Sequence, residues 1–133
     1  MTASLQRRKV LNFSEYRAFK IIADDLATAR KGYRVFAQTS LGEILQSPDR
    51  DAFRSINSKR VDILIVDRNG WPVVAVEYQG EGHYQGTAAA RDAIKKEALR
   101  KAGVSYVEVF STDSEDQIRS RVREQLSQNK AVA

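Results

Sequence analysis

Two almost wholly apolar runs separated by Asp-Arg-Asn-Gly most constrain how this chain can fold, and together they fill residues 60–79. Both runs are rich in Val and Ile, which favour strands. Asn69-Gly70 is a strong hairpin signal because its tight turn needs two residues with positive φ. We therefore predict an antiparallel hairpin. Because consecutive positions in each strand are apolar, both faces of the sheet must be buried under helices.

An acid stands near the outer end of each predicted strand, Asp62 in the first and Glu77 in the second. Counting back from the turn brings these two residues side by side in the antiparallel pair. Adjacent carboxylates repel each other unless a cation lies between them. In a chain with no cysteine and one histidine, oxygen ligands favour Mg²⁺ or Mn²⁺ over zinc. The alternative is that each acid simply ends its strand in solvent.

The rest of the chain predicts helices and strands around this hairpin, within one α/β domain over residues 1–133 and an ordered core at about 12–127. We expect Ser14 to cap the first helix. The last strand follows a helix and should therefore lie parallel to its neighbour. The predicted elements are a helix at 13–31, a strand at 33–38, a helical turn at 40–45, a surface connection at 49–59 with room for a helical turn through Ala52, Phe53 and Ile56, the hairpin, a helix at 88–102, a strand at 104–110 and a helix at 114–126.

Charge and composition limit the kinds of partner and the kinds of site that this chain can have. The 133 residues carry a formal net charge of +5, which favours a polyanionic partner. The absence of cysteine excludes disulfides and cysteine nucleophiles. No apolar run reaches the length of about 18 residues that a membrane span needs, and no signal-peptide pattern follows the basic start, so we expect a cytoplasmic protein with no membrane partner.

Further candidate site residues lie in the helix predicted at 88–102 and in the loop that joins the hairpin to this helix. Asp92, Lys95, Lys96 and Leu99 share a helix face by their spacing, while Ile94 and the alanines nearby offer a surface for packing. A lysine from this face can reach the carboxylate pair; alternatively, these residues form only a solvated ion pair. His83 lies in a Gly-rich loop directly after the second strand, where it either assists the site or is an idle surface residue.

The order of the predicted elements, with Asp62 and then Glu-Tyr-Gln at 77–79 across a hairpin, resembles the PD-(D/E)XK restriction-endonuclease-like superfamily. Three longer runs are Ile-Asn-Ser-Lys-Arg-Val-Asp at 56–62, Val-Glu-Tyr-Gln-Gly-Glu-Gly-His at 76–83 and Arg-Asp-Ala-Ile-Lys at 91–95. They resemble more closely a bacterial domain-of-unknown-function family related to the very-short-patch repair endonucleases. The resemblance implies an αβββαβ(α) core with a four-stranded mixed sheet flanked by helices, and metal-dependent hydrolysis of phosphodiester bonds.

The resemblance also implies roles for individual residues. Asp62 and Glu77 would hold the metal together with the Tyr78 carbonyl, and Lys95 would be the base or cation carried by the helix. The supporting residues would be His83, Asp92 and, from the first helix, Glu15, with Lys96 as an additional candidate. Gln79 departs from the pattern, since the superfamily has Lys there and the closer relatives have Asp. Glutamine can bind a metal or orient water through its oxygen, but it cannot replace the charge of a lysine.

We therefore expect an Mg²⁺- or Mn²⁺-dependent DNA endonuclease. Basic side chains would hold the DNA backbone with little sequence selectivity, namely Arg54, Lys59, Arg60 and Arg91. If the enzyme cuts both strands, a homodimer would supply two sites. Two alternatives stay open: an inactive DNA-binding module of the same fold, and a protein-interaction domain of a defence or mobile-element system.

Overall fold

The computed structural model describes residues 2–80 and 87–129, with side chains left undescribed at 87–91. Its sheet is four-stranded and mixed, as predicted: the strand order is β1-β2-β3-β4, with β1, β2 and β3 antiparallel and β4 parallel to β3. The elements in chain order are α1 (Phe13–Ala29), β1 (Arg34–Ser40), α2 (Leu41–Ile44), α3 (Arg50–Ile56), β2 (Arg60–Val66), β3 (Pro72–Gln79), α4 (Thr87–Lys101), β4 (Ser105–Phe110) and α5 (Glu115–Gln128).

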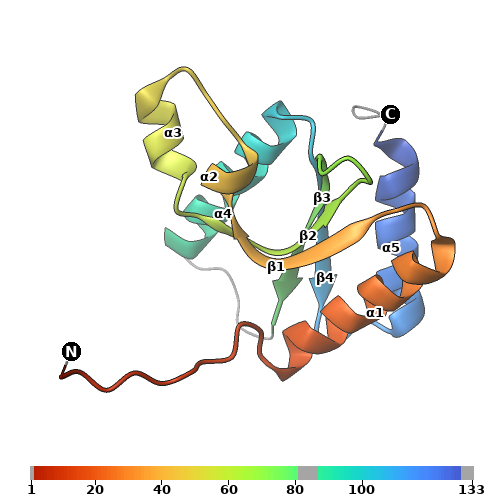
Figure 1. Ribbon diagram of the computed structural model, residues 1–133. Helices are drawn as coiled ribbons and strands as arrows, with labels where there is room; N and C mark the ends of the chain where they lie inside the picture. The colour runs from red at the N-terminus through yellow and green to blue at the C-terminus, as the bar shows by residue number, and fades with distance from the viewer. Residues whose placement is uncertain (1, 81–86, 130–133) are drawn as a thin grey trace.

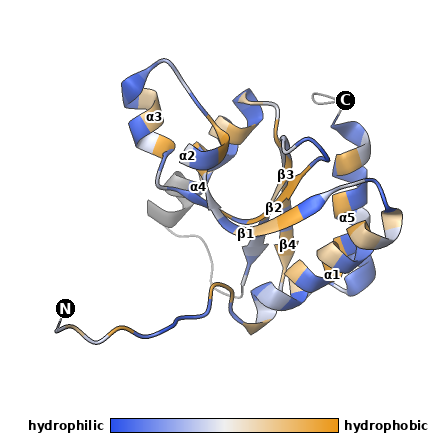
Figure 2. Cartoon of the chain, in the orientation of Figure 1, coloured by the Kyte–Doolittle hydropathy of each residue, from blue (hydrophilic) through white to orange (hydrophobic). Residues whose placement is uncertain are grey.

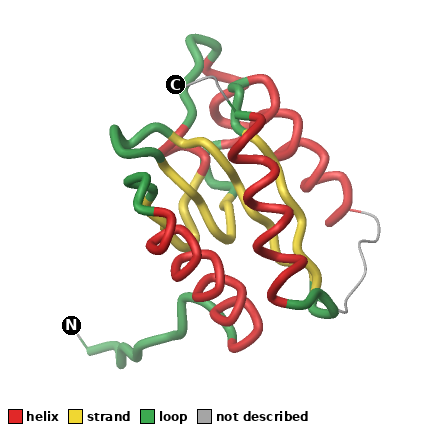
Figure 3. The backbone as a smooth tube through the Cα atoms, turned by 90° about the vertical axis from the view of Figure 1, so that its right-hand side faces the viewer, coloured by secondary structure: helices red, strands yellow, loops and turns green. Residues whose placement is uncertain are grey.

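Helices cover both faces of the sheet, which confirms the expectation from the apolar runs. Figure 1 shows α1 and α5 against one face and α2 and α4 against the other, with α3 beside α2 and α4, and Figure 3 views the molecule from the side of α1 and α5. On the first face Ile22, Ile118 and Ile63 belong to one buried core cluster, and on the second Leu99 and Leu64 belong to another. The strands are correspondingly the most uniformly apolar part of the chain (Figure 2).

The hairpin turn differs from the predicted one. Among the described residues of the turn, only Gly70 has a positive φ, at 89°, so the expected pair of left-handed residues is wrong. The Gly70 N–H donates to the Asp67 carbonyl (3.0 Å) and the Asp67 N–H to the Trp71 carbonyl (2.9 Å). This is a three-residue loop of the kind built on a type I turn. The Asp67 carboxylate favours it by accepting the N–H groups of Asn69 and Trp71.

A bulge restores the pairing that the longer loop would have displaced. The register between β2 and β3 shifts within the hairpin, which leaves Val73 as an extra residue on β3. Beyond the shift Ile63 lies opposite Val76. Asp62 and Glu77 come next on their strands, so the loop and the bulge together return them to facing positions.

One local prediction is extended and one is corrected. The helical turn expected through Ala52, Phe53 and Ile56 is a seven-residue helix, α3. Asp49 caps this helix by accepting the N–H groups of Asp51 and Ala52. In the first helix the cap is Asn12 and not Ser14, because Asn12 and Glu15 exchange hydrogen bonds in a capping box. No helix within residues 2–80 and 87–129 is long and apolar enough to cross a membrane.

The capping box gives a first testable result. We expect Asn12→Ala to lower the free energy of unfolding by about 1 kcal/mol, because the first turn of α1 loses its side-chain acceptor. Ser14→Ala is the matched control and should change stability by less than about 0.5 kcal/mol. Urea denaturation of both variants measures the difference. Equal losses at the two positions would contradict the assignment of the cap.

Candidate active site

The β2 and β3 strands separate at the end where the two acids stand. Their paired register ends at Ile63 and Val76. Beyond that point side chains replace backbone partners: the Asp62 N–H donates to Glu77 Oε2 (2.8 Å), and the Tyr78 N–H donates to Asp62 Oδ2 (2.9 Å). Each carboxylate thus binds the backbone of the opposite strand. The hairpin brings Asp62 and Glu77 together, as their spacing predicted.

Lys95 reaches this pair from α4. Its Nζ forms a close ion pair with Glu77 Oε1, lies 3.8 Å from Asp92 Oδ1, and donates to the Arg60 carbonyl at 2.9 Å. The side chains of Lys95 and Glu77 are only 12% and 4% exposed. The interaction is therefore a buried ion pair, in which removing either partner leaves the other charge uncompensated.

The face of α4 that packs on the sheet is not the expected one. Leu99 is fully buried, and Asp92 and Lys95 are half-buried on the same side of the helix. Ile94, which we predicted to pack, is 47% exposed. Lys96 points away from the carboxylates and lies over the ring of Tyr106, with its Nζ 5.3 Å from the ring centroid. Of the two lysines, the structure thus brings Lys95 to Glu77 and places Lys96 over Tyr106.

Both carboxylates are harder to ionise than they would be in water, chiefly because they are buried. Burial raises the pKa of Glu77 to about 7, and the charge of Asp62 adds to this, outweighing the attraction of Lys95. Burial also raises the pKa of Asp62, and the charge of Glu15 adds to that effect. Glu15 therefore acts on the site from the first turn of α1, which lies at the same end of the sheet (Figure 1).

Asp113 is a buried acid of this protein whose negative charge is compensated by its hydrogen-bond donors. Burial alone would raise the pKa of Asp113, but hydrogen bonds from Arg121 and from the Phe110 N–H outweigh it and hold that pKa below its usual value. Asp113 thus ties β4 to α5 as a structural residue. Glu77 likewise has a backbone N–H donor, from Asp62, and a cation, Lys95, but burial and the charge of Asp62 outweigh them. A second buried carboxylate beside Glu77 therefore marks the Asp62–Glu77 pair as a place that can accept a further cation.

Gln79 is buried beside a residue that the sequence reading missed. Its Nε2 donates to Glu108 Oε2 on the neighbouring strand β4 (3.0 Å). Because an ionised carboxylate only accepts hydrogen bonds, Glu108 holds the nitrogen of the Gln79 amide and turns its Oε1 the other way. An acid between Val107 and Val109 was a detectable signal of the same kind as Asp62 and Glu77.

The remaining candidates are less closely connected to the pair. His83 and the side chain of Arg91 lie outside the described residues. Arg54 is exposed on α3, 4.0 Å from Asp51, and the basic Lys59 and Arg60 stand where β2 begins. Within residues 2–80 and 92–129, whose side chains are described, no three Asp, Glu or His gather closely enough to hold a metal ion by themselves. The role of the Tyr78 carbonyl stays a prediction.

Comparisons with known proteins place the chain in a family. A family model described as "Protein of unknown function (DUF2726)" matches residues 7–129. The chain belongs to the DUF2726 family. This match spans every element from α1 to α5, so the carboxylate pair, Lys95 and the capping box all lie within the DUF2726 region.

Two relatives of this DUF2726 protein are similar over most of its length. An uncharacterized protein of Haemophilus influenzae is 52% identical over 103 residues, which are 77% of this chain and 54% of the relative. The uncharacterized protein y4bI of Sinorhizobium fredii is 46% identical over 126 residues, which are 95% of this chain and 91% of the relative. The chain thus spans about half of the first relative and most of the second. No solved structure matches the chain.

The buried ion pair gives a prediction for this DUF2726 protein without metal. Above pH 7 the wild type holds Glu77 ionised against Lys95, whereas in Lys95→Met the carboxyl must take up a proton to stay buried. Each pH unit above about 7 should therefore add about 1.4 kcal/mol to the loss of unfolding free energy in the variant. The destabilisation measured by urea at pH 8 should exceed that at pH 6 by roughly this amount.

Lys96→Met is the matched control, because Lys96 lies one residue along α4 and is exposed over Tyr106. Its effect on stability should be the same at both pH values. A loss in Lys95→Met that does not grow with pH would mean that Lys95 does not compensate the Glu77 charge.

Proposed function

We propose that this DUF2726 protein is a metal-dependent deoxyribonuclease that hydrolyses phosphodiester bonds at the Asp62–Glu77 pair. One observation carries the proposal: two carboxylates from separated strands meet beside a buried lysine. Burial and then the charge of Asp62 raise the pKa of Glu77, so a cation bound between the carboxylates would be favoured, and a phosphodiester reaction needs one to offset the charge of the phosphate.

The donor set fits a hard divalent cation. Asp62 and Glu77 offer carboxylate oxygens, and the Tyr78 carbonyl follows directly on the same strand. Mg²⁺ and Mn²⁺ prefer such oxygen ligands and keep several water molecules, so two carboxylates and one carbonyl suffice on the protein side. When bound, the ion supplies an activated water and stabilises charge on the scissile phosphate.

The surrounding residues supply the rest of the chemistry in this proposal. Lys95, which contacts Glu77, would stabilise the negative charge that develops on the phosphate oxygens. Asp92 would hold the ammonium group of Lys95 in place. Gln79, turned by Glu108, would present its Oε1 to orient a water molecule. His83 would assist proton transfer from the loop after β3.

The order of elements supports the same reading. Without the short helices α2 and α3, the chain reads helix, three strands, helix, strand, helix, which is the order that the resemblance to the PD-(D/E)XK superfamily implies. In that superfamily the lysine of the motif stands at the position of Gln79. Here the cation beside the carboxylates comes from α4 as Lys95. We extend the proposal to a likeness with the very-short-patch repair endonucleases on the motif at 76–83.

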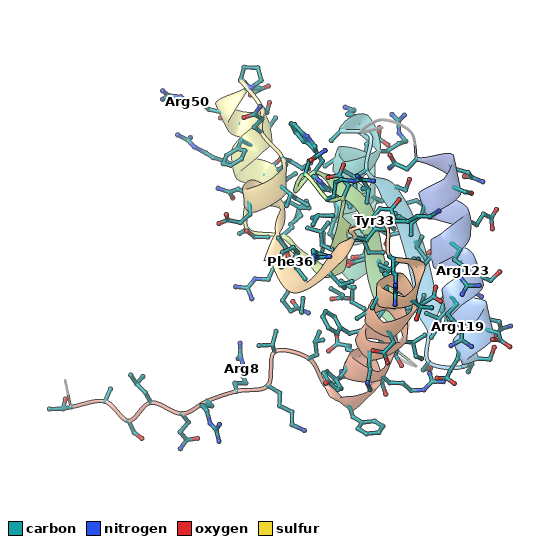
Figure 4. The ribbon with its side chains drawn as sticks, turned by 45° about the vertical axis from the view of Figure 1, so that its right-hand side comes forward. Arg8, Tyr33, Phe36, Arg50, Arg119 and Arg123 are labelled. Atoms are coloured by element: carbon teal, nitrogen blue, oxygen red, sulfur yellow. The ribbon has the colours of Figure 1, made fainter. Side chains whose placement is uncertain are left out.

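DNA is the proposed partner. The net charge of +5 favours a polyanion, and Arg54, Lys59, Arg60 and Arg91 would contact its backbone. Figure 4 shows Arg8 on an extended arm that leaves the body of the protein ahead of α1. Arg7, Arg8 and Lys9 are exposed on this arm and would add to backbone binding without reading sequence.

The decisive experiment incubates the purified protein with supercoiled, linear, single-stranded and branched DNA, each with Mg²⁺, Mn²⁺ or EDTA. The proposal expects cleavage of at least one substrate with metal and none with EDTA. DNA that is bound but never cut would favour an inactive DNA-binding module, for which the neutral Gln79 is the one specific argument. Neither binding nor cleavage would favour an interaction domain of a defence or mobile-element system.

A further inference from the structure

Gln38 has a backbone conformation that a long side chain rarely adopts. It lies within β1, yet its φ is 54°, in the left-handed region. Among the described residues only one other non-glycine has a positive φ, Arg30 with a φ of 55°, and it ends α1, where such a conformation is common. A left-handed residue inside a strand is disfavoured unless its surroundings hold it there.

The unusual residue sits opposite Asp62. In the antiparallel register of β1 and β2, Ala37 pairs with Ile63 and Thr39 with Val61, while Gln38 is passed over. By the same count its place in the ladder is across from Asp62. The side chain of Gln38 spans this gap and donates from Nε2 to Asp62 Oδ1, at 3.3 Å.

The two oxygens of Asp62 are therefore held separately. The Tyr78 N–H donates to Oδ2 from β3, and the Gln38 amide donates to Oδ1 from β1. Two donors on opposite sides fix the rotation of the carboxylate plane. Each oxygen still has a second lone pair that can bind a cation.

We propose that Gln38 is a positioning residue of the Asp62–Glu77 site, kept in a left-handed conformation so that its amide fixes the Asp62 carboxylate for a divalent cation. The inference rests on the proposed function, because it explains the orientation of the Asp62 carboxylate by the binding of a divalent cation there. Partners that orient a ligand typically change metal affinity by about 10- to 100-fold when removed. If the left-handed conformation of Gln38 only followed from the path of the chain, replacing Gln38 would not change the metal affinity.

Glycine replacement separates these two explanations. Gln38→Gly removes the amide and also relieves the backbone, because glycine adopts positive φ freely. We expect its metal-free melting temperature to be unchanged or raised, and its affinity for Mn²⁺, measured by calorimetry, to fall about tenfold or more. Gln38→Asn, which also tolerates the left-handed region but is one methylene shorter, should weaken Mn²⁺ binding similarly.

Arg30→Gly is the matched control, since Arg30 has nearly the same φ but lies at the end of α1. It should leave Mn²⁺ affinity unchanged. Wild-type affinity in Gln38→Gly, or a large fall in its melting temperature, would overturn the inference while leaving the proposed function intact. Failure of the wild-type protein to bind Mn²⁺ at all would instead overturn the metal site itself, and this inference with it.

Discussion

Asp62→Asn is expected to slow metal-dependent DNA cleavage by roughly 10³-fold or more. Asparagine has the shape of aspartate and keeps an oxygen to accept the Tyr78 N–H, and the Gln38 amide can turn its own oxygen toward the new NH₂ group, so the separated strands should stay in place. What the variant loses is one of the two negative charges that would hold the cation. The expected loss is therefore in the rate and not in the fold, and plasmid nicking at saturating Mn²⁺ measures it.

Asp51→Asn is the matched control for this experiment. Asp51 is an acid on α3 whose side chain is 95% exposed, and its replacement should leave cleavage unchanged. Circular dichroism and melting temperature should show that both variants are folded. Cleavage by Asp62→Asn at the wild-type rate would show that any nuclease activity comes from elsewhere on the protein.

Glu77→Gln should abolish much of the pH dependence of stability in the metal-free protein. Burial raises the pKa of Glu77 in the fold from 4.5 to about 7. Between these values the folded state binds more protons than the unfolded state, so the wild type loses stability as the pH rises through this window. The loss amounts to about 3 kcal/mol at about 1.4 kcal/mol per unit. Glutamine does not titrate, so its variant should lack this loss.

Urea denaturation in EDTA at pH 5, 6, 7 and 8 measures this effect as the difference between variant and wild type. The free energy of unfolding of Glu77→Gln minus that of the wild type should increase as the pH rises and level off above pH 7. Glu43→Gln, at an exposed position on α2, should show no such trend. A flat difference for Glu77→Gln would mean that the buried carboxyl titrates as it does in water.

The hairpin and its two acids were predictable because local pattern fixes them. Apolar runs around an Asn-Gly turn specify two strands, and strand geometry then brings Asp62 and Glu77 together whatever the details of the turn. The turn itself was mispredicted, since the Asp67 side chain stabilises a longer loop. The pairing survived because Val73 adds the compensating bulge.

Other features depend on contacts between distant segments and leave little trace in the sequence. Nothing near Gln38 signals a left-handed residue, because its partner Asp62 lies on another strand. Spacing placed Lys95 and Lys96 on one face of α4, but only the position of Leu99 against the sheet decides which of them turns inward. Glu108 could have been noticed as an acid within an apolar strand.

Titration of Mn²⁺ into metal-free protein by calorimetry tests the central claim most directly, because it asks whether the Asp62–Glu77 pair binds a divalent cation, independently of any DNA substrate. We predict saturable binding to the wild type, with a loss of at least about 100-fold in affinity in Asp62→Asn and none in Asp51→Asn. Absence of binding to the wild type, or equal affinity in Asp62→Asn, would contradict the claim.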